Sequence, residues 1–220
     1  MGRFARGYEA LARTIMMIAV VHVAMIAYTL AGLVVAGLFP SVAAAYGTFR
    51  RWLRSPDDRG WTVRQSWTTF RKAWRSELVS ANLLGWPLTA LWALLLWEYW
   101  IVQRNDFGVA GVAVSGVLLM VNVFYLVFQG LVWICHVHFA EATAWVLRRA
   151  AMLAVGRPLC SLMILATAVT VAWLYWKWPG LGAAFGLALP IFAVIAIAYC
   201  WARLPGLNPH GSNPAPDGDS

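Results

Sequence analysis

Long apolar runs alternate with shorter polar segments along the whole chain. Each run is close to the roughly 20 apolar residues that a helix needs to cross the hydrocarbon core of a bilayer. The runs lie at about 14–38, 78–102, 108–135, 158–176 and 181–202. The pattern predicts an all-α protein, a polytopic transmembrane helical bundle of about five spans. We expect residues 1–203 to form a single integral membrane domain.

The polar segment 61–78 has a different pattern, which is that of an amphipathic helix. Its aromatic residues Trp67, Phe70 and Trp74 recur at helical spacing, and Arg71 lies on the adjacent stripe with other arginines. An aromatic face flanked by arginines is typical of a helix that lies in a membrane interface. We therefore expect the aromatic rings at headgroup depth, with the arginines facing lipid phosphate or an acidic partner surface. Plain retention of topology by positive charge explains the arginines equally well.

Composition supports the membrane assignment. Of the 220 residues, 61% are hydrophobic and 12% are charged, whereas soluble domains carry about 25% charged residues. The net charge of +8 does not require nucleic acid, because cytoplasmic loops of membrane proteins are basic and anionic lipid headgroups are the simpler partner. The tail 204–220 is rich in Pro, Gly, Asn and Ser and is expected to be disordered.

The distribution of Lys and Arg predicts the orientation of the chain. Twelve of the 17 lie in the loop 39–77, the loop after the third span and the tail, and five lie on the opposite side. Because basic loops stay in the cytoplasm, we expect a multi-pass membrane protein with its N-terminus outside and its C-terminus in the cytoplasm. The flanks of the first span are evenly charged, which weakens this signal.

The third predicted span carries polar residues at intervals of seven. Ser115, Asn122, Gln129 and His136 form one seam along the helix, because seven residues are nearly two helical turns. Polar groups in hydrocarbon seek partners on neighbouring helices, so the first interpretation of the seam is helix packing. The alternative is a permeation or substrate path.

No catalytic motif is recognisable. The chain has no G-x-S-x-G, no H-E-x-x-H and no phosphate-binding glycine loop. Its three cysteines share no metal-binding spacing, and His136, His138 and Glu141 diverge around one continuous helix. We expect no enzymatic activity, no cofactor and no metal. An enzyme acting on lipid or lipid-linked sugar remains an alternative.

The stretch 37–54, GLFPSVAAAYGTFRRWLR, joins the end of the first apolar run to a basic, aromatic segment. We expect Gly37 and Pro40 to end the first span, the arginines to lie at the lipid phosphates and Trp52 to be an interfacial anchor. The block resembles the YesL family of bacterial membrane proteins. Six of the matching residues are our candidate site residues: Gly37, Pro40, Ser41, Arg51, Trp52 and Arg54.

The resemblance implies a function only in outline. The YesL family has no firmly established biochemical activity, but similar proteins are commonly encoded beside carbohydrate importers and glycosidases. The leading hypothesis is therefore a non-enzymatic accessory or scaffold protein of a bacterial inner membrane, associated with carbohydrate uptake. Its expected partners are subunits of a carbohydrate ABC importer. The alternative is a small transporter or channel that uses the polar seam of the third span.

Overall fold

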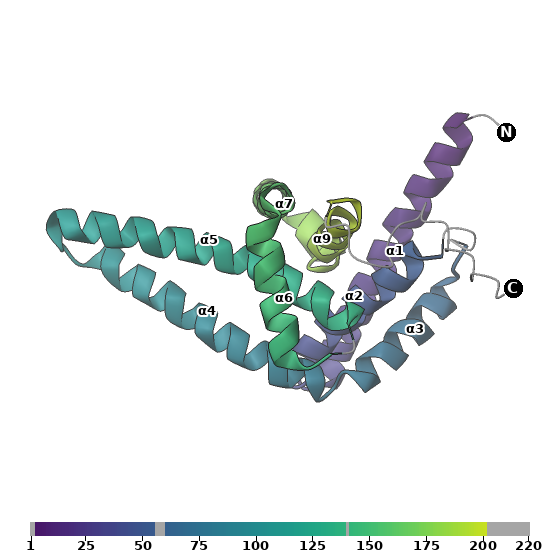
Figure 1. The fold of residues 1–220 in the computed structure, drawn as a ribbon. Coiled ribbons are helices and arrows are strands. Elements are labelled where there is room, and N and C mark those ends of the chain that lie inside the picture. Colours follow the sequence, from purple (N-terminus) through teal and green to yellow (C-terminus); the bar gives the residue numbers. More distant parts are fainter. Residues whose placement is uncertain (1–2, 56–59, 140, 202–220) are drawn as a thin grey trace, which may run out of the picture.

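The computed structural model describes residues 3–55, 60–139 and 141–201, and the predicted disordered tail lies outside these residues. The described part is all-helical, as the hydrophobic pattern predicts, and it forms a helical bundle (Figure 1). In chain order the helices are α1 Arg3–Ala31, α2 Leu38–Leu53, α3 Val63–Ser76, α4 Ser80–Arg104, α5 Gly108–His138, α6 Thr143–Gly156, α7 Pro158–Lys177, α8 Pro179–Phe185 and α9 Ala188–Trp201.

Helix α2 lies at the centre of the molecule. It contacts α1, α3, α4, α5 and α9, and ten of its sixteen residues are buried. Ala43, Ala44 and Ala45 are at most 1% exposed, and their small side chains let neighbouring helices approach closely. Helix α4 also approaches through a glycine, because a Cβ at Gly85 would lie 2.3 Å from the ring of Phe39.

The first helix ends earlier than the apolar run predicts. It stops at Ala31, and residues 32–37 form turns before α2 begins. Gly37 and Pro40 therefore do not end the first span: Gly37 precedes α2, and Pro40 lies in the first turn of α2, where proline is tolerated because that N–H has no intrahelical partner. Hydropathy did not reveal this boundary, because the turn is as apolar as the helix.

The turn between α1 and α2 is strained. Val34 has φ 65°, a left-handed conformation that is an outlier for a β-branched residue. Such a conformation persists only where the surrounding structure holds it. Here the Val34 N–H donates to the Thr29 carbonyl at 2.8 Å and the Val34 carbonyl accepts from Leu38 N–H at 2.9 Å. These bonds let the chain reverse from α1 into α2.

The aromatic face of α3 packs on the protein. Trp67, Phe70 and Trp74 surround the ring of Tyr28 of α1, with centroids 5.3–5.6 Å away. Phe70 is fully buried, while Arg71 is exposed. Helix α3 is amphipathic, as predicted, and its aromatic face packs on α1 and α2. The prediction that these rings lie at headgroup depth stays a prediction.

Helices α4 and α5 form an antiparallel hairpin that projects away from the other helices (Figure 1). The chain reverses at its tip through residues 105–107. Outside the base of the hairpin many of its apolar side chains are exposed, including Leu94, Val117 and Met120. Such a surface is compatible with lipid, which solvates apolar side chains.

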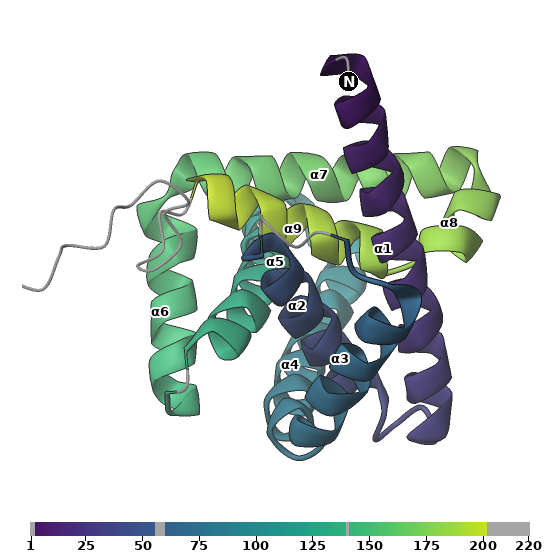
Figure 2. The same cartoon turned by 90° about the vertical axis from the view of Figure 1, so that its right-hand side faces the viewer.

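The C-terminal helices lie against α1 and α5 (Figure 2). Helix α7 ends at Lys177, and α8 starts at once with Pro179. The predicted fifth span is not one continuous helix, because α8 and α9 meet at a bend of 73° beside Gly186. Gly186 has φ 39°, so an L side chain would be strained there.

Four of the described helices are long and apolar enough to cross a membrane, and the bent pair α8–α9 gives a fifth candidate. The four are Gly7–Ala31 within α1, together with α4, α5 and α7. Their lengths and composition support a multi-pass membrane protein. The candidates differ in direction, because the α4–α5 hairpin extends sideways from α1 and α7 runs across α1 (Figures 1 and 2).

Candidate functional site

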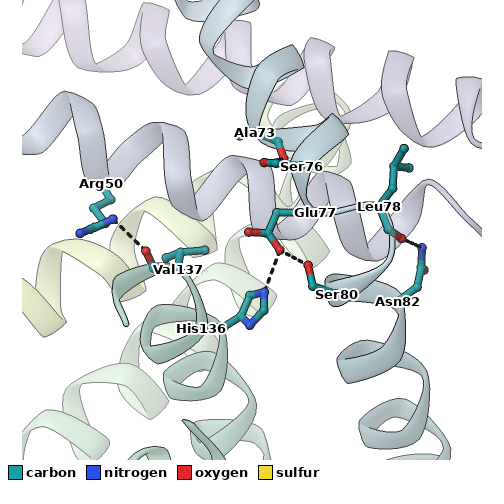
Figure 3. Close-up of polar contacts among 9 residues, drawn as sticks. All are labelled: Arg50, Ala73, Ser76, Glu77, Leu78, Ser80, Asn82, His136 and Val137. Carbon is teal, nitrogen blue, oxygen red and sulfur yellow. Dashed lines mark hydrogen bonds and ion pairs between the residues drawn. The ribbon is translucent and has the colours of Figure 1, made fainter. Parts of the chain in front are cut away.

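A polar junction lies where α2, the α3–α4 corner and the end of α5 meet (Figure 3). We define it by Arg50, Glu77, Ser80, His136 and the carbonyl of Val137. At its centre, His136 Nε2 lies 2.9 Å from Glu77 Oε2. The two side chains are 16% and 25% exposed, respectively. They join segments 59 residues apart, so the contact ties the α3–α4 corner to α5.

Local structure places Glu77 at the corner. It follows the last residue of α3, and its N–H donates to the carbonyls of Ala73 and Trp74. The Ser80 hydroxyl, in the first turn of α4, donates to Glu77 Oε2. The hydrogen bond from His136 lowers the pKa of the Glu77 carboxyl, with a further contribution from Ser80, while burial acts in the opposite direction. The carboxylate is therefore the favoured form.

Arg50 approaches the same end of α5 from α2. Its Nη1 donates to the carbonyl of Val137 at 2.8 Å, one of the last carbonyls of α5, which have no partner within the helix. Burial lowers the pKa of Arg50, the nearby Tyr199 raises it, and the charges of Arg54 and Arg51 lower it. The guanidinium thus caps α5 in a setting of concentrated positive charge.

Two further polar contacts fix the apolar turn before α2. Asn82 Nδ2 donates to the carbonyl of Ala36 at 2.9 Å and to that of Leu78 at 2.7 Å. Trp74 Nε1 donates to the carbonyl of Gly37 at 3.4 Å. Helices α3 and α4 therefore hold the start of α2 by side chain to backbone bonds. Figure 3 shows Asn82 beside Leu78, apart from the Glu77–His136 pair.

The chemistry that this junction offers is a hydrogen bond between His136 and the Glu77 carboxylate. A Ser–His–acid triad places histidine between the hydroxyl and the carboxylate, so that histidine can take the hydroxyl proton. Here both Ser80 and His136 contact Glu77 Oε2. The Ser80 hydroxyl donates its proton to the carboxylate and not to the histidine. The serine is therefore not activated as a nucleophile. The described residues contain no group of three or more His, Cys, Asp or Glu that could hold a metal ion.

The predicted motif residues on α2 divide between core and surface. Pro40, Ser41 and Trp52 are buried, whereas Arg51 and Arg54 are exposed. The expectation that Trp52 is an interfacial anchor is wrong, because its side chain is only 3% exposed and lies against Phe192 of α9. The burial of α2 from five sides accounts for this difference.

The polar seam of α5 faces α4 over much of its length. Ser115 Oγ accepts from Gln103 Nε2 at 3.1 Å, and Asn122 Nδ2 lies 3.4 Å from the carbonyl of Leu95. Gln129, the next seam residue after Asn122, is half-buried. Beside the seam, the Tyr125 hydroxyl donates to the carbonyl of Leu88. These contacts favour helix packing over an open path.

Sequence reasoning missed Glu77 and Ser80. His136 was recognisable as a seam residue, but its partner is distant in sequence and belongs to a segment read as a basic amphipathic helix. Glu77 is an acid in a segment rich in arginine, which is the one signal that could have singled it out. Helical periodicity cannot reveal a contact between separate helices.

Comparisons with known proteins support a relationship to an uncharacterised family. The family described as "Protein of unknown function, DUF624" matches residues 18–99, which include α2, α3 and most of α4. The chain is also similar to the "Uncharacterized protein YteU" of Bacillus subtilis (strain 168), with 26% identity over 194 residues, 86% of this chain and 79% of that protein. No solved structure is significantly similar to the chain. The family match includes Glu77 and Ser80 but not His136.

Proposed function

We propose that the protein is a non-enzymatic accessory or scaffold protein of a bacterial cell membrane. The observation that carries this proposal is that two kinds of polar side chain lie in different places: those of the α5 seam bond to a neighbouring helix, and the cations of α2 and α3 face outward. Seam residues such as Ser115 and Asn122 bond to the adjacent helix α4. Apart from Arg50, the cations of α2, its C-terminal cap and α3 are instead exposed and have no ion pair among the described residues. They are Arg51, Arg54, Arg64, Arg71, Lys72 and Arg75.

An exposed cationic face suits an anionic partner. Arg64, Arg71 and Arg75 project from a helix whose opposite face is fixed to α1, so the charges are held in place. Fixed charges of one sign select a partner surface of the opposite sign and speed its encounter. The partners that we propose are anionic lipid headgroups and, from the resemblance to the YesL family, subunits of a carbohydrate ABC importer.

A crosslinking experiment in native membranes tests this role. A photoreactive residue at Lys72 on α3 is expected to capture an importer subunit, whereas the same residue at Asp106 on the hairpin tip is not. Arg71→Glu with Arg75→Glu should abolish the capture without loss of the folded protein. Capture of no importer subunit at Lys72, together with unchanged carbohydrate uptake in a deletion strain, would remove the support for this role.

One observation favours a transporter as the second candidate. Broken helices at membrane depth are typical of substrate sites in transporters, and the α8–α9 pair is broken at Gly186. The buried His22 of α1 lies there, with Nε2 3.1 Å from the carbonyl of Ala183. The Tyr175 hydroxyl donates to the carbonyl of Gly186 at 2.6 Å.

Reconstitution distinguishes this candidate from the scaffold role. Solute flux that is lost on His22→Ala but survives Asn122→Leu with Gln129→Leu would locate the path at the helix break. Flux that is lost only with the seam variants would locate it in α5. Absence of flux from vesicles containing the folded protein would leave the scaffold as the better assignment.

A further inference from the structure

Three arginines gather around one hollow at the end of α2. The hollow has a volume of about 450 Å³ and is open on one side, which is within the size range of small-molecule sites. Its lining residues are Arg50, Arg51, Arg54, Ser55 and Trp61. Arg51 and Arg54 are exposed, and Trp61 is buried. The three arginines have no carboxylate partner among the described residues.

The inner side of the hollow is formed by Arg50, whose guanidinium is fixed in place. Its Nη1 caps α5, its Nε is buried, and the nearby hydroxyl of Tyr199 interacts with the guanidinium. Arg50 therefore adds a fixed positive charge to the hollow, which favours a bound anion there.

The helix end explains only part of this arrangement. Cations near a helix C-terminus interact favourably with the helix dipole, and Arg50 and Arg51 lie in the last turn of α2. That effect does not require a hollow beside a buried tryptophan. Nor does it favour three neighbouring guanidinium groups, whose mutual repulsion contributes to the lowered pKa of Arg50.

We propose that this hollow binds a phosphate group, with the Arg51 and Arg54 guanidinium groups forming paired hydrogen bonds to its oxygens and Arg50 closing the inner side. Guanidinium has the planar geometry that matches phosphate in a bidentate manner. The indole of Trp61 is an apolar wall for the substituent of a phosphate ester. This site deepens the proposed contact with anionic headgroups, and it is independent of any importer partner.

Phosphate can come from a lipid headgroup or from a soluble molecule, so the test has two arms. In the first, protein in nanodiscs of phosphatidylcholine is titrated with inorganic phosphate at constant ionic strength, with chloride as the reference, and the thermal unfolding midpoint is followed. In the second, phosphatidylglycerol replaces part of the lipid and bound lipid is counted by native mass spectrometry. A response confined to one arm supports the site and identifies the source.

Matched variants connect the response to the hollow. We expect Arg51→Gln with Arg54→Gln to weaken binding at least tenfold, because both exposed guanidinium groups are lost. Arg148→Gln with Arg149→Gln removes the same charge from exposed positions of α6 and should bind like the wild type. Equal weakening by both pairs would overturn the proposal, since a diffuse positive field would then explain the binding.

A conservative pair guards against a loss of folding. Arg51→Lys with Arg54→Lys retains the charge and removes the paired hydrogen bonds, so it should also bind at least tenfold more weakly while its unfolding midpoint without phosphate stays unchanged. Binding of this pair at wild-type affinity would contradict a built phosphate site. Absence of any response of the wild type in both arms would contradict it as well.

Discussion

Glu77 is the residue of the polar junction that contacts both α4 and α5. Its carboxylate contacts His136 of α5 and accepts from the Ser80 hydroxyl of α4. Removal of one partner of a partly buried hydrogen bond leaves the other partner unsatisfied. The free energy of unfolding should therefore depend on this side chain more than on any exposed acid.

Replacement of Glu77 by Gln should lower the free energy of unfolding by about 1.5–3 kcal/mol, the range for a hydrogen bond to a charged group. The measurement is the thermal unfolding midpoint in detergent. Glu141→Gln is the control, because Glu141 is exposed and should change little. His136→Gln should cost about as much as Glu77→Gln, and the double variant should cost less than the sum. Strict additivity of the two losses would show that the pair is not coupled.

The same pair makes stability depend on pH. The pKa of Glu77 is lowered from its ordinary value of 4.5, so its contribution is fully present above that value and is lost as the pH falls through the folded-state pKa. Wild type and Glu77→Gln should therefore differ in unfolding midpoint near neutral pH and converge in acid. A difference that stays constant on acidification would contradict the assignment.

Gly186 is a second residue whose identity matters. Its φ of 39° is strained for any L side chain, and a Cβ there would lie 2.1 Å from Cε1 of His22. Gly186→Ala should lower the unfolding midpoint, and His22→Ala should restore part of the loss by removing the collision. Gly116→Ala is the control, because a Cβ at Gly116 meets nothing within 4 Å. If His22→Ala restores none of the loss, a collision with His22 is not the cause of the destabilisation.

At the scale of elements, the sequence predicts where the helices lie along the chain better than it predicts which helices pack against one another. Runs of apolar residues located α4, α5 and α7 closely, because a span of about 20 apolar residues has few other structures available. The aromatic stripe of α3 was also recognisable. What periodicity cannot supply is the surface against which a stripe packs, since protein and membrane interface both favour aromatic rings.

Phe70 distinguishes these two surfaces. It is fully buried between helices, so Phe70→Ala should cost about 3–5 kcal/mol through lost contacts and a cavity. Arg71→Ala, one position away and exposed, should cost little. The comparison is made by thermal unfolding in detergent. A small effect of Phe70→Ala would instead support a helix that rests in the membrane interface.

The polar junction and the arginine-lined hollow could be predicted only in part from the sequence, because both depend on how the helices pack. Arg51 and Arg54 were identified as part of a basic block, and His136 as part of a seam. The hollow beside Trp61 and the contact with Glu77 exist only after α2 takes its central position. The small residues Ala43–Ala45 permitted that position, but they are equally compatible with a turn at the membrane surface.

At the scale of the whole molecule, α3 lies near the start of α4, and the tip of the α4–α5 hairpin lies at the other end of α4. Lys72 of α3 and Asp106 at the tip are both exposed, and α4 connects the two regions. Cysteines at these positions should therefore react with a membrane-impermeant maleimide from opposite sides of the membrane. The positive-inside rule predicts that Asp106→Cys reacts in intact cells and Lys72→Cys only after permeabilisation. Reaction of both from the same side would contradict a spanning hairpin.

The break between α8 and α9 has a consequence for biogenesis. The two pieces have 7 and 14 residues, and each is shorter than the roughly 20 residues that a single inserting segment needs. Neither half is therefore expected to leave the insertion machinery as an autonomous unit. Both contact α1, and both contact α7, so these earlier helices would serve as the template on which the last segment is completed. The chain would then acquire its final topology only after most of it has been synthesised.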